Sequence, residues 1–195
     1  GGAGLVSYSY LGEHFNAGLL VRKDSPNYAA LVNSGLDRRN YEAAATVGYT
    51  APGFGALSAG LAAFKAYQGQ DRKSASLSYS RTVLDGRGSV FVTVVNERAQ
   101  DRQTNVFLGF SYNFDADYSL IGNYQRLRGE SSESLQFQKA QPVGEGLGYV
   151  IGASRTGSSE GSSTQFTPSF QYNGRLGIVR GYAQQSDNSN STSVY

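Results

Sequence analysis

Side chains that could carry out catalysis or bind a metal are scarce in this sequence. His14 is the only histidine, and there is no cysteine. A zinc site built from histidine and cysteine ligands is therefore not available within the chain. A serine nucleophile activated by histidine would need His14 together with an acid that no motif specifies. We expect a structural or interfacial role for His14, with no catalytic residue, no metal-binding residue and no enzymatic activity.

A glycine-rich segment offers a second possible chemistry, the binding of a phosphate. Gly144-Glu145-Gly146-Leu147-Gly148 lacks the spacing of a nucleotide-binding loop, and a strand pattern follows it where such a loop needs a helix. The segment therefore predicts a hairpin turn and no cofactor. Asn190-Ser191-Thr192 matches a glycosylation sequon, but we interpret it as part of a surface loop.

The composition excludes several classes of protein. Only 16% of the residues are charged, against about 25% in average globular proteins. No apolar run approaches the roughly 20 residues of a membrane-spanning helix. A net charge of +2 without a basic cluster argues against a nucleic acid partner. Since the chain begins without methionine or a signal peptide, we expect it to be a segment of a longer protein.

Alternation of apolar and polar residues with a period of two runs through the sequence and predicts β-strands. It is clearest between Val106 and Phe114, where every second residue is apolar. The pattern predicts about twelve strands, near residues 4–11, 14–23, 41–50, 54–66, 72–83, 87–98, 103–114, 117–127, 133–140, 146–156, 163–173 and 175–185.

The connections between the predicted strands alternate in kind, and the longer ones all fall at the same end of the strands. The short, turn-like connections include Gly12-Glu13, Ala51-Pro52-Gly53, Asp85-Gly86-Arg87, Asp115-Ala116-Asp117, Gln141-Pro142-Val143-Gly144 and the hairpin signal Asn173-Gly174. The longer, polar connections are residues 24–39, 68–71, 99–102, 128–132, 157–162 and 186–190.

Short turns at one end, longer loops at the other and strands of about ten residues are typical of an outer-membrane β-barrel. Such a sheet must close and turn its apolar face outward, because no backbone polar group can stay unpaired in lipid. We therefore predict an all-β, antiparallel transmembrane β-barrel segment that covers residues 1–195 and is part of a larger barrel. The alternative is a soluble sandwich or a β-solenoid, whose polar faces should carry more lysine and glutamate.

The alternation assigns side chains to two environments. The predicted lipid-facing residues are apolar: Leu77, Tyr79, Leu108, Phe110, Leu147 and Ile151. The predicted pore-lining residues are polar and uncharged: Ser74, Ser76, Ser78, Ser80, Ser111, Asn113, Gln136, Gln138, Gln165, Thr167 and Gln171.

Some residues do not fit this alternation simply. Charge at the lipid midplane costs roughly 2–4 kcal/mol, so basic residues in strands should face the pore or lie near the headgroups. Pro168 has the parity of apolar residues and no N–H to donate, which predicts a bulge or an irregular ladder. Asp24 is expected among the solvated loop charges. Arg22 alternates in phase with polar residues and is expected in the pore. Arg126, Arg155 and Arg180 alternate in phase with apolar residues and are expected near a rim of the barrel. Lys65 is expected in one of these two environments.

Several runs of residues resemble the barrel of a fimbrial outer-membrane usher. They are Lys73-Ser-Ala-Ser-Leu-Ser-Tyr-Ser-Arg81, Gly88-Ser-Val-Phe-Val-Thr-Val-Val95 and Val106-Phe-Leu-Gly-Phe-Ser-Tyr112. Leu135-Gln-Phe-Gln-Lys-Ala-Gln-Pro142, which leads into Gly144-Glu-Gly-Leu-Gly-Tyr149, is similar to the usher pattern of a strand, a Pro-Gly turn and a Gly-x-Gly-Tyr strand. The resemblance is clearest over residues 72–185.

The resemblance implies a large barrel that secretes and assembles pilus subunits delivered by a periplasmic chaperone, and that is gated by a plug. This segment would be barrel wall downstream of the plug, without the plug or the N- and C-terminal periplasmic domains. It would lie in the bacterial outer membrane as a multi-pass β-barrel. The implied partners are membrane lipid, pilus subunits and their chaperone.

Two other functions stay open at this point. A general porin or a self-contained small barrel would suit an even number of strands, although a porin constriction needs opposed charge clusters that are sparse here. A barrel enzyme, such as a surface lipase, would need a Ser-His pair that includes His14.

Overall fold

A computed structural model of the chain describes residues 1–26, 39–67, 69–159, 161–187 and 189–194. The regular elements in these ranges are all strands, and no helix that could cross a membrane occurs in them. The strands are β1 (Ala3–Leu11), β2 (Phe15–Asp24), β3 (Arg39–Ala51), β4 (Gly55–Ala66), β5 (Arg72–Val83), β6 (Gly88–Arg98), β7 (Arg102–Asn113), β8 (Tyr118–Leu127), β9 (Glu130–Lys139), β10 (Gly146–Ser158), β11 (Gly161–Gly174), β12 (Gly177–Ser186) and β13 (Ser189–Val194).

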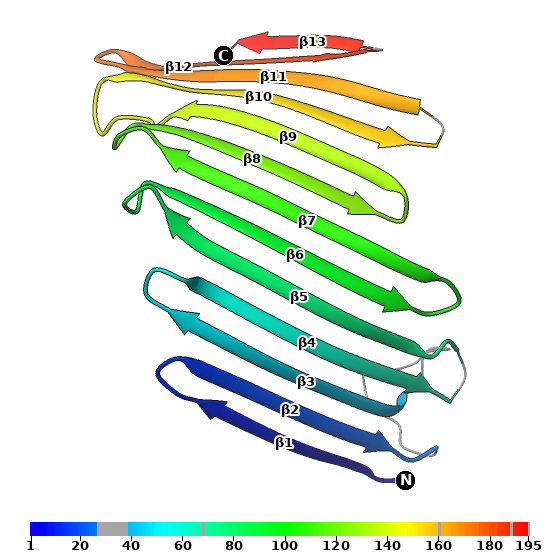
Figure 1. The fold of residues 1–195 in the computed structure, drawn as a ribbon. Coiled ribbons are helices and arrows are strands. Elements are labelled where there is room, and N and C mark those ends of the chain that lie inside the picture. The colour runs from blue at the N-terminus through cyan, green and yellow to red at the C-terminus, as the bar shows by residue number, and fades with distance from the viewer. Residues whose placement is uncertain (27–38, 68, 160, 188, 195) are drawn as a thin grey trace. The chain divides into compact units, whose positions relative to one another are not determined.

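The strands follow one another in a single sheet, in the order of the sequence from β1 to β13 (Figure 1). Each described pairing joins two strands that are neighbours in sequence, and each is antiparallel. The predicted all-β antiparallel architecture is therefore confirmed. The described chain has thirteen strands where about twelve were expected, because Ser189–Val194 pairs with β12 as a further strand.

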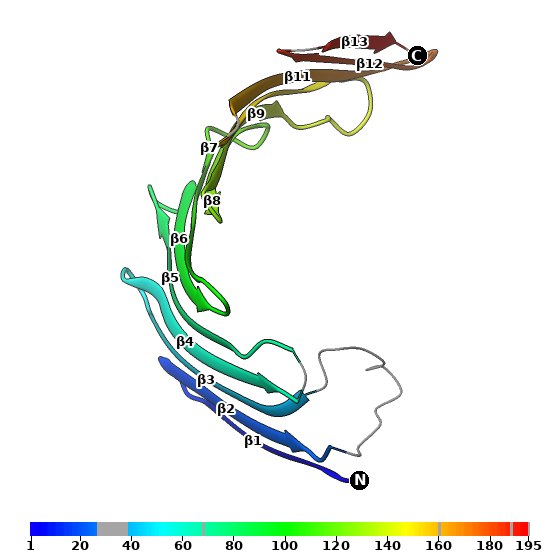
Figure 2. The ribbon, with the colours of Figure 1, turned by 90° about the vertical axis from the view of Figure 1, so that its right-hand side faces the viewer.

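The chain divides into two compact units, which we describe separately. Unit 1 contains Gly1–Arg81 and Val92–Asn105, and unit 2 contains Thr82–Phe91 and Val106–Tyr195. Unit 1 therefore holds β1 to β4, most of β5 and the adjoining parts of β6 and β7. Within each unit the described strands form one layer (Figure 2).

The connections differ from the prediction that one end carries the longer loops. β8 ends at Leu127 and β9 begins at Glu130, so Arg128 and Gly129 alone make a turn, both with positive φ (52° and 87°). Two consecutive residues of this conformation make a type I′ hairpin turn, which the sequence does not announce with Asn-Gly. Two residues also separate β10 from β11 and β12 from β13, because Ser158 pairs with Gly161 and Ser186 pairs with Ser189. The predicted loop at 24–39 lies largely outside the described residues.

The described residues contain no buried hydrophobic side chain. A globular domain of this length would bury a core between two layers. Here leucine, phenylalanine and tyrosine side chains instead remain exposed along the strands, such as Leu61 (64% exposed), Leu77 (53%) and Phe170 (42%). The functional question therefore concerns the two faces of the sheet.

Candidate functional site: the two faces of the sheet

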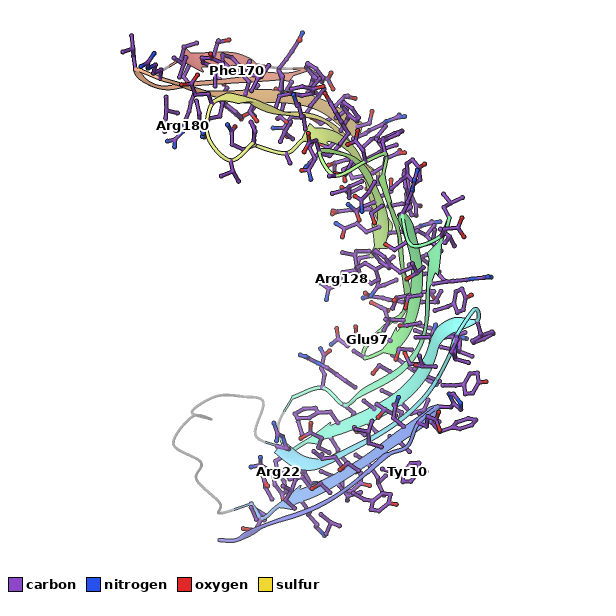
Figure 3. The ribbon with its side chains drawn as sticks, turned by 90° about the vertical axis from the view of Figure 1, so that its left-hand side faces the viewer. Tyr10, Arg22, Glu97, Arg128, Phe170 and Arg180 are labelled. Carbon is purple, nitrogen blue, oxygen red and sulfur yellow. The ribbon has the colours of Figure 1, made fainter. Side chains whose placement is uncertain are left out.

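The register between strands decides which side chains share a face, because directly opposed residues in an antiparallel pair lie on the same side. In Figure 3, Tyr10 of unit 1 projects from one face, and Arg22 and Glu97 project from the other. In unit 2, Phe170 projects from one face, and Arg128 and Arg180 project from the other (Figure 3). We call the face of Tyr10 in unit 1 and of Phe170 in unit 2 the apolar face of that unit, and the opposite one its polar face.

The apolar face of unit 1 is continuous from β1 to β5. Tyr8 lies opposite Leu19, which lies opposite Ala45, which in turn lies opposite Leu61. The same row continues from Leu61 to Ala75 on β5. The neighbouring row brings Val47, Ala59 and Leu77 together. Leu77 and Tyr79 therefore share this face with the apolar side chains of four other strands.

The polar face of unit 1 is built mainly from small side chains. Ser74, Ser76, Ser78 and Ser80 lie opposite Ala62, Gly60, Ser58 and Ala56, respectively. The Thr93 hydroxyl donates to Ser78 Oγ at 3.0 Å, which places Thr93 of β6 on the same face. All four predicted pore-lining serines of β5 thus lie together on one face, among other small side chains.

The apolar face of unit 2 carries larger side chains. Leu108 lies opposite Tyr124, and Phe110 lies opposite Gly122. Ile151 lies opposite Phe137 on one side and Pro168 on the other. Leu147 lies opposite Tyr172. The predicted lipid-facing residues Leu108, Phe110, Leu147 and Ile151 are therefore brought to one face of unit 2.

The polar face of unit 2 holds the remaining predicted pore-lining residues in a hydrogen-bonded amide surface. Gln136 donates to Gln138 at 3.1 Å, and Gln171 donates to Asn173 at 2.9 Å. The Ser111 and Ser89 hydroxyls are 2.8 Å apart. Pairing across β7 to β11 places Ser111, Asn113, Gln136, Gln138, Gln165, Thr167 and Gln171 on this face.

Aromatic side chains gather on each apolar face at one end of the strands, near the predicted short turns. In unit 1, the Tyr49 ring packs against Phe15 (4.8 Å between centroids) and Phe54 (5.5 Å), and Phe54 packs against Tyr79 (5.7 Å). The Tyr79 hydroxyl donates to the Phe54 carbonyl. In unit 2, a second chain of rings joins Tyr112, Phe114, Phe137, Tyr118 and Tyr149. Tyrosine rings at such a position can bury carbon while the hydroxyl keeps a polar partner.

Three phenylalanine rings lie across a glycine on the neighbouring strand, an arrangement that the alternation does not predict. A Cβ added to Gly122 would overlap the ring of Phe110, and one added to Gly181 would overlap Phe170. The third ring, Phe91, covers Gly109 on the polar face of unit 2. The glycines therefore make room for rings that lie flat over the sheet.

An ion pair with two hydrogen bonds lies on the polar face of unit 1. Arg22 binds the Asp24 carboxylate through Nε (2.9 Å) and Nη2 (3.1 Å). Asp24 is 4% exposed, so its expected place among the solvated loop charges is wrong. The two side chains lie on the same face because they are two residues apart in one strand. Arg39 and Glu42 form a second pair at 2.8 Å.

Arg126, Arg155 and Arg180 were all expected on the same face as apolar residues, but the structure places them on two different faces. Arg126 and Arg155 lie on the apolar face of unit 2 towards the ends of β8 and β10, and Arg155 is opposite Glu133. Arg180 instead lies on the polar face and donates to Gln171 Oε1 at 2.9 Å. Ile178 and Tyr182 also lie on the polar face. The expectation for Arg180 was therefore wrong, because it assumed that these apolar residues mark the apolar face of β12. Lys65 lies on the apolar face of unit 1, next to the last residue of β4.

Pro168 interrupts a ladder without a bulge. Pairs of β11 and β12 are formed at Phe166↔Gln185 and at Ser169↔Tyr182, with the same register on both sides of the proline. The two pairs between them are missing because proline lacks the N–H that would close this part of the ladder. The predicted irregular ladder is therefore correct, and the bulge is not.

The surroundings of His14 do not assemble a catalytic group. Its Nδ1 is 3.1 Å from the Thr50 carbonyl oxygen, its Nε2 is 3.9 Å from Glu13, and its ring is tilted against Tyr49. None of these contacts is with a serine. Among the described residues, no group of three or more histidine, aspartate or glutamate side chains could hold a metal ion.

Basic side chains on the apolar face of unit 1 were also missed as a group. Lys23 lies opposite Tyr41, which lies opposite Lys65, and Lys73 follows on β5. The sequence could have indicated this group, since each of these lysines alternates in phase with apolar residues and lies near a predicted loop.

No protein-family model, no curated protein and no solved structure matches this chain. Its function is therefore argued from the composition of the two faces.

Proposed function

We propose that this chain is part of the wall of an outer-membrane channel, with the apolar faces against lipid and the polar faces towards an aqueous pore. The observation that carries the proposal is the exposed apolar face in a chain whose described residues bury no hydrophobic side chain. Water-exposed apolar patches of more than a few hundred Å² are rare in soluble monomers. Contact with lipid removes this difficulty, because lipid solvates leucine and phenylalanine side chains.

The distribution of residues along the strands also supports a membrane-spanning wall. On β2, Phe15 lies in the aromatic cluster of unit 1, and Lys23 lies eight positions further on the same face. At about 3.3 Å per residue this separation is about 26 Å along the strand. A strand tilted by about 40° would span about 20 Å of membrane with it, close to the ~25 Å apolar band of transmembrane barrels.

The cargo that suits this wall best is a folded protein, as the resemblance to ushers implies. We propose that the pore passes pilus subunits delivered by a periplasmic chaperone. The serine row of β5 and the glutamines of β9 supply hydrogen-bonding groups without net charge. A surface of this kind would stay hydrated and would hold a passing protein only weakly, since a solvent-exposed hydrogen bond contributes little net free energy.

Cysteine scanning of the full protein tests the assignment of the faces, and the absence of cysteine from this chain makes it practical. Matched neighbours on opposite faces are Leu77 and Ser78 in unit 1, and Leu108 and Ser111 in unit 2. Cysteine at the serine positions should react with a membrane-impermeant thiol reagent, and cysteine at the leucine positions should not. Equal reactivity within both pairs would contradict the proposal, and surface pili counted in the same strains would test the cargo.

A porin is the second candidate, and one observation favours it. The Arg22–Asp24 and Arg39–Glu42 pairs place opposed charges on the polar face of unit 1, as a solute-selective constriction requires. Planar-bilayer recordings of the full protein separate the two functions. Steady conductance of small ions together with normal growth of pili after gene deletion would favour the porin. Loss of pili after deletion would favour the protein-translocation channel.

A further inference from the structure

The apolar face of unit 1 carries a strongly asymmetric distribution of charge. Glu42 lies on the polar face opposite Arg22, and Asp24 binds that arginine. Glu97 projects with Arg22 in Figure 3. These are the acidic residues of the described strands of unit 1, and none is on the apolar face. Six basic residues do lie there: Arg81 beside the aromatic cluster, and Lys23, Lys65, Lys73, Arg98 and Arg102 towards the opposite end of the strands.

The placement of Arg98 and Arg102 follows from hydrogen bonds of β6. Thr93 contacts Ser78 on the polar face, so Asn96, three residues later, lies on the apolar face. Asn96 donates to Thr104 at 2.9 Å, which brings the start of β7 to the same face. Arg98 and Arg102 are each two residues beyond this pair towards the β6–β7 connection. Both side chains are exposed, and neither forms a salt bridge within the described part of the chain.

Three of the basic residues border a shallow depression in this face. It has a volume of about 490 Å³ and is lined by apolar side chains of β2 to β5. Leu19 and Leu61 stand on opposite sides of Ala45, whose single methyl group leaves the space between them open. Lys73, Arg98 and Arg102 close the depression at the end that is away from the aromatic cluster. Apolar walls with a cationic end match one kind of molecule, an acyl chain that carries an anionic headgroup.

We propose that this depression is a binding site for an anionic, phosphate-bearing membrane lipid. Its acyl chain lies over Ala45 between Leu19 and Leu61, and its headgroup phosphate is held by Lys73, Arg98 and Arg102. The inference rests on the proposed function, because it requires the apolar face of unit 1 to contact lipid. Arginine and lysine both suit a phosphate, arginine through its paired donors and lysine as a point charge. Lys23 and Lys65 extend the cationic end along the same membrane surface.

Unit 2 provides the matched comparison. Its apolar face carries Arg126, Arg155 and Lys139. Lys139 lies over the Tyr118 ring in the aromatic cluster, and Glu133 lies directly opposite Arg155 and offsets its positive charge. Leu135, which is 49% exposed, lies beside Glu133 on β9. Leu61 is its counterpart in unit 1. We expect the preference for anionic lipid at Leu61 and not at Leu135.

Fluorescence quenching by lipids brominated in the acyl chain can report on each position, since this chain contains no tryptophan. The full protein is reconstituted with Leu61→Trp or Leu135→Trp in phosphatidylcholine vesicles that contain brominated phosphatidylglycerol or brominated phosphatidylcholine. Emission is taken as the difference from the unsubstituted protein. We expect Leu61→Trp to favour the anionic lipid about a hundredfold, since Lys73, Arg98 and Arg102 contribute about fivefold each, and Leu135→Trp to show no preference.

Charge variants then locate the headgroup. In the Leu61→Trp background, Lys73→Gln should lower the preference by about fivefold, as about 1 kcal/mol per surface cation predicts. Removing Arg98 and Arg102 as well should abolish it. Arg72→Gln is the matched control, because Arg72 is the preceding residue, carries the same charge and lies on the polar face opposite Phe64. Ala45→Leu should weaken quenching by filling the space between Leu19 and Leu61, without removing a charge.

Each outcome bears on the proposal. Equal quenching by the two lipids at Leu61→Trp would overturn the lipid site alone and leave the channel wall intact. Displacement of brominated phosphatidylglycerol by soluble glycerol phosphate would show that the site binds phosphate without the chain, and would also overturn it. Absence of quenching at both tryptophans in the inserted protein would mean that neither apolar face meets lipid. That result would overturn the proposed function as well.

Discussion

Units 1 and 2 follow the same alternation of faces but fill those faces with side chains of different size. In unit 1, alanine and glycine are frequent on both sides of the sheet, as in the row of Ala45 and the row of Gly60. In unit 2, phenylalanine rings cover the apolar face, and glutamine amides bond to one another on the polar face. Polarity is therefore distributed alike in the two units, whereas the size of the side chains on the faces is not.

Charge differs between the units as well. The buried carboxylate of unit 1, Asp24, is held by an arginine, while Arg180 of unit 2 donates to a neutral amide. The difference shows that a polar face can be stabilised either by an ion pair among small residues or by a network of amides. Substitutions matched between the units can test how far this comparison holds.

The largest effect is expected at the ion pair of unit 1. Arg22→Ala leaves the Asp24 carboxylate without its main partner at a site where it is only 4% exposed. We expect the free energy of unfolding of the full protein to fall by about 3 kcal/mol. Arg180→Ala in unit 2 should lower it by about 1 kcal/mol, since it removes one hydrogen bond to an amide. Urea unfolding in lipid vesicles measures both, and equal losses would remove the contrast between the units.

A smaller effect, equal in the two units, is expected where polarity alone matters. Leu108→Asp places a carboxylate on the apolar face of unit 2, at a cost of about 2 kcal/mol if the position is near the membrane midplane. Outer-membrane abundance should fall, while Ser111→Asp on the polar face of the same strand should leave it nearly normal. Leu77→Asp and Ser78→Asp are the corresponding pair in unit 1. Normal abundance of both leucine variants would refute the lipid-facing assignment.

Replacing a glycine by alanine should lower the free energy of unfolding more in unit 2 than in unit 1, because the neighbouring side chain is larger in unit 2. In unit 2, Gly122→Ala would push its new methyl group into the Phe110 ring, and we expect a loss of about 1–2 kcal/mol from overpacking. In unit 1, the new methyl group of Gly60→Ala is crowded by the Ser76 hydroxyl, 2.8 Å away, which can rotate, and its other neighbours lie at ordinary contact distance. The loss there should be below about 1 kcal/mol. Combining Gly122→Ala with Phe110→Leu should recover part of the stability, and its failure to do so would exclude the ring as the cause.

The smallest effects are expected for single changes on the polar faces. Ser78→Ala in unit 1 and Gln136→Ala in unit 2 each remove one hydrogen-bonding side chain, worth about 1 kcal/mol or less. Under the proposed function, export of pilus subunits, measured as surface pili at a known abundance of the protein, should stay nearly intact in both variants. Lost export at normal abundance in either variant would replace the passive wall by a specific contact with the cargo.

The sequence by itself determined the strands and the side of each strand on which its residues lie. Period-two alternation is a local property, since successive side chains point to opposite faces whatever the neighbouring strands do. For this reason the predicted groups that contain Leu77, Ser78, Leu108 and Gln136 are each brought together on one face of their unit. The antiparallel order also follows from the sequence, because short connections join only strands that run in opposite directions.

Tertiary structure decided what depends on pairing between strands. The register of β12 against β11 placed Arg180 beside Gln171, although its nearest neighbours in sequence are apolar. Pairing of β8 with β9 reduced an expected loop to Arg128 and Gly129, since strand hydrogen bonds outweighed the loop preference of serine. Rings over glycines and the burial of Asp24 likewise need a partner strand at a defined register. Such contacts depend on the register between neighbouring strands, and the alternation along a single strand does not contain that information.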